Sequence, residues 1–216
     1  KSLNAVKLII KGKKIVFLGF TLWDNAQRKK PGTTPYGRLF RKAVKTLKKE
    51  GYFIIVYPHW NYEYIDYPAP DNRRIARKLI DCGVDLIVGS HPHVIQGYEE
   101  YKGKYIFHSF GNFIFHSDVF KNMSMIENDP RLNITFILSV NIYDNNDYNF
   151  EIIPVYADDS GLRMLNGAEK EQFDEKMDQI SNVLYNNSRY KKLFYTDSSA
   201  MIKQTNKVFK KLIADV

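Results

Sequence analysis

Residues 76–96 read ARKLIDCGVDLIVGSHPHVIQ, and they combine the end of a helix, a buried strand and a pair of histidines. Asp71 is predicted to cap the start of this helix. The apolar residues of the helix recur at helical spacing: Ile75, Ala76, Leu79 and Ile80. Gly83 stands where a helix-ending glycine belongs, and residues 85–89 (DLIVG) are typical of a strand buried on both faces.

The chain before this stretch shows the same alternation of strand and helix. The apolar runs 14–20 (KIVFLGF) and 52–58 (YFIIVYP) predict two more buried strands. Between them, residues 36–50 predict an amphipathic helix that ends at Gly51. Strand, helix and strand in this order predict parallel strands joined by right-handed crossovers.

After His93 the pattern changes to antiparallel strands. Two pairs of segments predict β-hairpins: 96–101 with 105–108, and 133–143 with 148–156. Two further helices are predicted near the end of the chain, over about 168–186 and 199–213. We therefore expect an α/β protein with parallel units first, antiparallel strands next and helices last.

The composition excludes several classes of protein. The 216 residues are 44% apolar, which excludes a disordered chain, and one cysteine, Cys82, excludes an internal disulfide. No apolar run reaches the roughly 20 residues that a membrane span needs. The net charge of +8 is uneven: residues 1–50 carry +12 and the remainder −4. This asymmetry fits a surface that faces nucleic acid or membrane, and it also fits a solvated basic helix face.

Three histidines occupy positions that favour chemistry. His59 follows the strand 52–58, and His91 and His93 follow the strand 85–89. Sites in open α/β sheets form at the carboxyl ends of parallel strands, so these imidazoles are expected at one edge. Pro92 favours an extended His91, which would project His91 and His93 in the same direction. Imidazoles suit Zn, Mn or Fe, although spacing alone leaves hydrogen-bonded surface histidines as an alternative.

Other polar residues near these histidines have two interpretations each. Glu63 and Asp66 follow His59 closely and either orient an imidazole or lie in water. Asn112, between two aromatic residues, offers an amide oxygen or a turn. His108 is interpreted as a packed or edge histidine because it follows the strand alternation, and His116 is also left outside the site.

Three ordered motifs resemble one family. Residues 59–64 (HWNYEY) look like the HWG-x-EY motif of the bacterial CapA-type capsule-synthesis proteins, which are linked to poly-γ-glutamate. Residues 76–96 resemble the helix-strand-HPHV-Q segment of that family, and residues 98–115 resemble its E-x-YKGK…SLGNF block. The resemblance covers about residues 5–190, and Asn61 replaces the usual glycine of the first motif.

The resemblance implies a fold. The family is similar to calcineurin-like metallophosphoesterases, which are four-layer α-β-β-α sandwiches with a dinuclear metal centre. Residues 1–160 would then form the C-terminal part of such a domain, incomplete at its N-terminus. Residues 161–216 would form a C-terminal helical segment packed on the same domain.

The resemblance also implies roles for residues. His59 and His91 would be catalytic and ligate one divalent metal (Mn, Fe or Zn), and His93 would ligate a second. From their places in the sequence and not from the resemblance, Glu63 and Asn112 are candidates to support these ligands. No other cofactor is expected. An earlier portion of the protein would supply the remaining ligands, so a partial or empty metal site is expected in residues 1–216 alone.

The implied function is capsule or poly-γ-glutamate biosynthesis at the cell envelope. The site would hydrolyse a phosphoester or the polymer itself in a metal-dependent reaction. The alternative is a non-catalytic subunit that binds or exports an acidic polymer, held by the basic helix 36–50. The expected partners are the polymer or phosphoester and other membrane subunits of polymer synthesis, and no nucleic acid. The location is expected to be extracytoplasmic and membrane-associated, with an anchor in the preceding portion.

Overall fold

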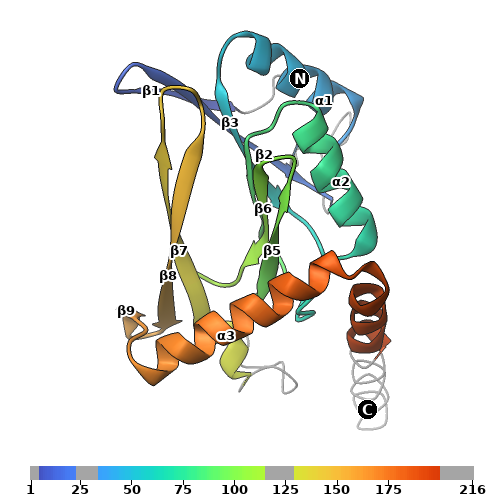
Figure 1. Ribbon diagram of the computed structural model, residues 1–216, viewed down its shortest axis with the longest axis vertical. Helices are drawn as coiled ribbons and strands as arrows, with labels where there is room; N and C mark the ends of the chain where they lie inside the picture. Colours follow the sequence, from blue (N-terminus) through green and yellow to red (C-terminus); the bar gives the residue numbers. More distant parts are fainter. Residues whose placement is uncertain (1–4, 23–33, 115–128, 200–216) are drawn as a thin grey trace, which may run out of the picture.

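The larger of two sheets carries the predicted parallel strands (Figure 1). The computed structural model describes residues 5–22, 34–114 and 129–199. The six strands of this sheet lie in the order β1-β2-β3-β4-β6-β5. Their bounds are β1 (Ala5–Ile10), β2 (Lys13–Thr21), β3 (Phe53–His59), β4 (Leu86–Val88), β5 (Ile95–Tyr101) and β6 (Lys104–Phe110). The four central strands are parallel, and β1 and β5 are antiparallel edge strands.

A smaller antiparallel sheet faces the larger one. It contains β7 (Ile134–Ile142), β8 (Tyr148–Asp158) and β9 (Gly161–Met164), and a short 3₁₀ turn, η2 (Pro130–Asn133), precedes it. Aromatic rings fill the space between the sheets: the Phe107 ring centroid lies 5.9 Å from that of Phe136 and 5.2 Å from that of Phe150. The hairpin predicted over 133–143 and 148–156 is therefore confirmed, and β9 extends it.

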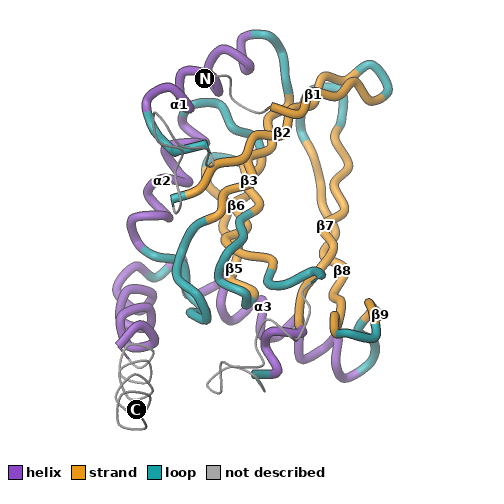
Figure 2. The backbone as a smooth tube through the Cα atoms, turned by 180° about the vertical axis from the view of Figure 1, so that it is seen from behind, coloured by secondary structure: helices purple, strands orange, loops and turns teal. Residues whose placement is uncertain are grey.

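Two helices cover the opposite face of the larger sheet (Figure 2). They are α1 (Arg38–Lys49) and α2 (Pro70–Asp81). Phe40 and Val44 of α1 and Leu79 of α2 pack in one cluster with Val16 and Ile54 of the sheet. Because the central strands have apolar side chains on both faces, the uninterrupted apolar runs of the sequence are explained.

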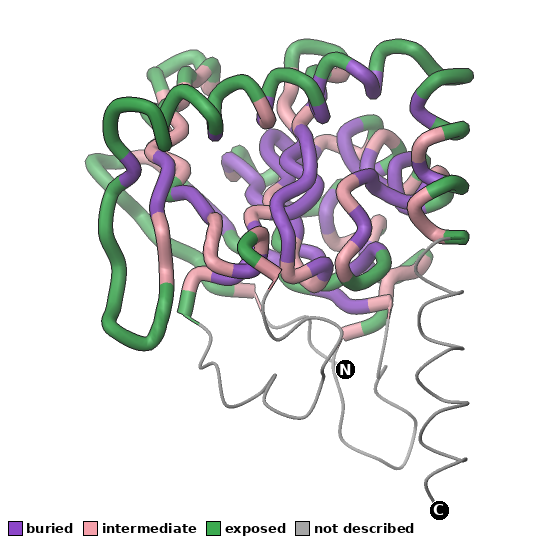
Figure 3. Tube along the Cα trace, turned by 90° about the horizontal axis from the view of Figure 1, so that it is seen from below, coloured by how far each residue is buried: buried purple, intermediate pink, exposed green. Residues whose placement is uncertain are grey.

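A third helix, α3 (Ala168–Asn182), runs along the β5 edge and spans the two sheets (Figure 3). A Cβ atom at Gly97 of β5 would lie 2.6 Å from the Ile180 carbonyl oxygen, so this approach requires glycine. The N–H groups of Tyr98 and Glu100 donate to Ser181 Oγ (3.0 Å) and to the hydroxyl of Tyr185 (2.9 Å), which lies in η3 (Val183–Tyr185). The helix therefore protects a sheet edge from other strands.

The mixed α/β class and the paired sheets are confirmed. The described residues supply the helical layer and both sheets of the predicted sandwich, while α3 lies across their shared edge. Phe173 and Met177 of α3 belong to the same cluster as Phe107. The division of the chain at residue 160 stays a prediction. No helix of the described segments has both the length and the apolar composition to span a membrane.

Three local predictions were inaccurate or incomplete. Ala69, not Asp71, is the N-cap of α2, because Pro70 occupies the first helical position and Asp71 lies in the first turn. A helix over 187–199 was not predicted. The helix predicted over 199–213 lies, except for its first residue, outside the described residues.

Candidate functional site

The predicted histidines lie at the carboxyl edge of the larger sheet. His59 is the last residue of β3, and a bridge pairs it with Ser90, two residues beyond β4. The Ser90 N–H donates to the Pro58 carbonyl (2.9 Å), and the Trp60 N–H donates to the Ser90 carbonyl (3.1 Å). The prediction that the two strand ends meet is confirmed.

The imidazoles of His59 and His91 face each other directly. His59 Nε2 lies 2.9 Å from His91 Nδ1, and the two ring centroids are 4.5 Å apart. The ring of His93 lies 6.2 Å from that of His91. Ser90 Oγ lies 3.4 Å from the other nitrogen of His59. The three histidines therefore form one cluster.

The backbone around His91 differs from the prediction. His91 has φ of 102° and His93 has φ of 63°, so the segment bends and is not extended. Such angles are uncommon for a residue with a side chain, and the position before proline normally disfavours them. The bend is held by the Tyr64 N–H, which donates to the Pro92 carbonyl at 2.8 Å. The two histidines thus converge through a strained turn, and such strain is frequent at functional sites.

His93 has a fixed orientation. Its Nδ1 lies 2.8 Å from Asn112 Oδ1, and the Asn112 amide in turn donates to the Leu132 carbonyl at 3.1 Å. Because an amide oxygen only accepts, Nδ1 carries a hydrogen in this contact. The Tyr64 ring stacks on His93 with centroids 5.7 Å apart, and Glu63 Oε1 lies 4.0 Å from Nε2. Asn112 and Glu63 therefore lie beside His93, and their supporting role stays a prediction.

Electrostatics keep His91 neutral. Burial, together with the neighbouring His59 and His93, lowers the pKa of His91 to about 4. Neutral imidazole is the form that binds a metal ion, because the ligand must offer a lone pair.

Two imidazole nitrogens, from His59 and His91, are spaced as ligands of one metal ion would be. Ligand nitrogens about 2.1 Å from a zinc ion lie about 3.0–3.4 Å apart, and the 2.9 Å between His59 Nε2 and His91 Nδ1 is close to this spacing. The described segments contain no group of three or more His, Cys, Asp or Glu side chains placed to hold an ion. Asp66, considered as a supporting carboxylate, instead pairs with Arg131 (2.7 Å) and Lys176 (2.6 Å).

His108 is a packed histidine, as predicted, and it belongs to a buried charge network. His108 and Glu99 are both fully buried, and His108 Nε2 lies 3.2 Å from Glu99 Oε1. Arg73 donates two hydrogen bonds to the same carboxylate (2.8 and 2.7 Å), and Arg77 donates a third (2.5 Å). Burial would raise the pKa of Glu99, but the hydrogen bonds from His108 and Arg73 hold it well below its usual range. Burial lowers the pKa of His108. His116 lies outside the described residues.

Asn61 is a positioning residue that the sequence analysis did not identify. It is fully buried, has φ of 68° and lies two residues after His59. Its Nδ2 donates to Gln96 Oε1, and its Oδ1 accepts from the Ala69 N–H and from Asn72 Nδ2, all at 3.0 Å. The sequence did indicate this role: Asn61 replaces a glycine of the motif, and asparagine is the residue that best tolerates a left-handed backbone after glycine.

Comparisons with known proteins show the family to which this chain is similar. Residues 2–117 match the family described as "Bacterial capsule synthesis protein PGA_cap". "PGA biosynthesis protein CapA" of Bacillus subtilis is 38% identical over 111 residues, which are 49% of this chain and 29% of that protein. "Capsule biosynthesis protein CapA" of Bacillus anthracis is 32% identical over 148 residues, which are 63% of this chain and 36% of that protein. The match thus spans about a third of these relatives.

A solved structure has a weaker likeness. It is described as the crystal structure of a novel phosphatase from Mycoplasma pneumoniae. The alignment covers 71% of this chain and 57% of that chain, with 11% identity and a TM-score of 0.45.

Proposed function

Because the chain belongs to the family of bacterial capsule synthesis proteins, we propose that it acts in capsule polymer biosynthesis through a metal-dependent hydrolase site at the histidine edge. The observation that carries the proposal is the 2.9 Å approach of His59 Nε2 to His91 Nδ1 at two adjoining strand ends. The substrate is a phosphoester or the polymer itself. The names of the two Bacillus relatives, which refer to PGA and capsule biosynthesis, support this pathway.

In this proposal the histidines hold Mn, Fe or Zn. His59 Nε2 and His91 Nδ1 are two ligands of one ion, and further ligands come from outside the described residues. Such an ion, when bound, polarises the bond to be hydrolysed and lowers the pKa of a bound water. His93, oriented by Asn112, presents Nε2 at the same edge, where it ligates a second ion or holds a proton. Glu63 Oε1, which lies 4.0 Å from the same nitrogen, is the neighbouring carboxylate.

The proposed location is extracytoplasmic and membrane-associated, at the cell envelope. A preceding segment of the protein is proposed to anchor the domain there. Other membrane subunits of polymer synthesis are its proposed partners.

The test is a hydrolysis assay. The protein, together with the segments that precede this chain, is loaded with Mn²⁺ or Zn²⁺ and given a generic phosphodiester. We expect hydrolysis that is lost in His91→Ala and kept in Asn149→Ala, an exposed position on β8. Hydrolysis that survives in His91→Ala would contradict the assigned site.

A second candidate function is a non-catalytic subunit that binds or exports an acidic polymer. The observation that favours it is the basic outer face of α1, where Arg38, Lys42, Lys45 and Lys49 are exposed. Full metal loading without hydrolysis, combined with polymer binding, would favour this candidate over the enzyme.

A further inference from the structure

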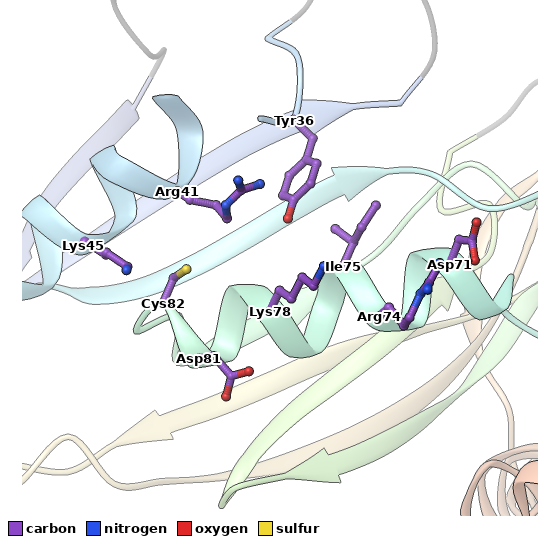
Figure 4. A pocket seen from close by; sticks show the side chains of 9 residues that line it. All are labelled: Tyr36, Arg41, Lys45, Asp71, Arg74, Ile75, Lys78, Asp81 and Cys82. Carbon is purple, nitrogen blue, oxygen red and sulfur yellow. Dashed lines mark hydrogen bonds and ion pairs between the residues drawn. The ribbon is translucent and has the colours of Figure 1, made fainter. Parts of the chain in front are cut away.

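We propose that the groove between α1 and α2 binds an extended polycarboxylate chain (Figure 4). The groove has a volume of about 650 Å³ and lies on the outer face of the larger sheet. The proposal rests on the capsule function above and deepens it, because it names where an acidic polymer contacts this chain.

Positive charge dominates the groove. Arg41 and Lys45 of α1 and Lys78 of α2 line it, and no carboxylate among the described residues pairs with any of the three. Like charges at close range repel each other, so an anion bound in the groove lowers the electrostatic free energy of these cations. Three uncompensated cations in one groove thus attract a polyanion.

The two carboxylates that line the groove do not cancel this charge. Asp71 pairs with Arg74 at 2.6 Å, in the first turn of α2. Asp81 pairs with Lys102, which lies in the turn between β5 and β6. Both acids are therefore already neutralised by cations other than the three named above.

The floor of the groove offers a hydrogen-bond donor. The Tyr36 hydroxyl is buried and has no hydrogen-bond partner within the described part of the chain. Figure 4 shows this hydroxyl directed toward α2, across the space between the helices. The Arg41 guanidinium lies 5.3 Å from the centre of the Tyr36 ring and is thereby positioned at the rim. A carboxylate can accept hydrogen bonds from both groups.

The dimensions favour a chain over a single small acid. The lining residues extend from the first turn of α2 to Cys82, just past its end, and the 12 residues of α2 span about 18 Å. An exposed ion pair contributes only about 0.2–1 kcal/mol, so one carboxylate gains little. Successive carboxylates on one chain engage several cations at once, and the contributions combine.

The groove begins at the histidine edge. Pro35, which precedes Tyr36 in the sequence, forms an isolated β-bridge with Thr21. Thr21 of β2 is in turn the register partner of His59 of β3. The first turn of α2 lies at the same edge, because a crossover helix starts where the preceding strand ends. A polymer in the groove is thus directed toward the histidines.

The test measures binding of labelled poly-L-glutamate to the full chain by fluorescence anisotropy, without metal. The groove variant is Arg41→Gln with Lys45→Gln and Lys78→Gln. The matched control removes three exposed cations elsewhere: Arg189→Gln, Lys191→Gln and Lys192→Gln. We expect about ten-fold weaker binding in the groove variant and less than about two-fold in the control. Tyr36→Phe keeps the ring beneath Arg41 and is expected to weaken binding about two-fold.

Equal weakening in both triple variants would overturn the proposal, because it would indicate unspecific attraction by net charge. Absence of saturable binding to the unmodified chain would overturn it as well. Polyphosphate serves as a competitor, and tighter groove-dependent binding of polyphosphate would contradict the carboxylate assignment. Because the assay needs neither metal nor hydrolysis, failure of polymer binding is distinguishable from failure of the hydrolase proposal.

Discussion

The histidines of the larger sheet fall into two groups with opposite surroundings. His108 lies within β6, fully buried against the Glu99 carboxylate. His59 and His91 lie at strand ends and face each other across 2.9 Å. A carboxylate partner and complete burial make the first histidine part of the core. Two imidazoles that converge at an edge, one with a pKa lowered to about 4, have the chemistry of metal ligands.

The largest expected effect is on stability, and it tests the buried network around His108. Glu99→Ala leaves Arg73 and His108 without their shared acceptor, and such an uncompensated buried charge typically costs about 3–5 kcal/mol. Urea denaturation measures the free energy of unfolding. The control is Glu100→Ala, an exposed neighbour on the same strand, with an expected change below about 0.5 kcal/mol. Similar values for both variants would contradict a structural role for the network.

The next largest effect is also on stability, and it concerns the buried Asn61, which follows the edge histidine His59 in the sequence. Asn61→Ala removes a buried amide that contacts Gln96 and Ala69, and we expect a loss of about 3 kcal/mol. Asn61→Gly removes the same hydrogen bonds but accepts φ of 68°, so it should be less destabilising by about 1 kcal/mol. Thermal or urea unfolding of both variants measures the difference. Equal stability of the two would show that the left-handed backbone carries no strain here.

A smaller effect is expected at the histidine edge. Asn112→Ala removes the acceptor that orients His93, and loss of such an orienting partner typically lowers metal affinity at least 10-fold, or about 1.4 kcal/mol. Calorimetric titration with Zn²⁺ or Mn²⁺, on the protein that includes the segments preceding this chain, measures the affinity. The matched control is Asn149→Ala on β8, which should bind metal like the unmodified chain. Unchanged affinity in Asn112→Ala would separate His93 from the metal site.

The smallest effect is a pH dependence of the metal-free protein. The pKa of His91 is about 4 in the folded protein and near the ordinary value of about 6.5 in the unfolded chain, so the unfolded chain binds more protons between these values. Its contribution to stability is present above about pH 6.5 and is lost as the pH falls toward 4. His91→Gln should therefore show a flatter dependence of Tm on pH over that window. Identical curves for the two proteins would contradict a lowered pKa.

The sequence predicted those strands that are buried on both faces of the sheet. β2 and β3 lie between helices and a second sheet, so their apolar runs are uninterrupted and were predicted. β1 is an edge strand with mostly exposed side chains, so its burial does not distinguish its two faces as clearly. The helix over 187–199 was missed because few of its residues, Tyr190 and Phe194 among them, are buried.

The candidate site was predictable in position but not in detail. Strand ends and histidine spacing located His59, His91 and His93 at one edge. The left-handed turn at His91 depends on contacts from Tyr64, far away in the sequence, and the proline rule alone indicated the opposite conformation. Asp66 pairs with Arg131 and Lys176, which lie 65 and 110 residues away in the sequence. Local sequence spacing therefore could not predict these ion pairs.

The central claim is that the edge histidines bind metal while His108 does not. Imidazole ¹⁵N chemical shifts, recorded while Zn²⁺ is added to the chelator-treated protein, test it most directly. We predict that His59 Nε2 and His91 Nδ1 shift to metal-bound values while the His108 nitrogens stay unchanged. Zinc binding that leaves the His59 and His91 nitrogens unshifted would contradict the account.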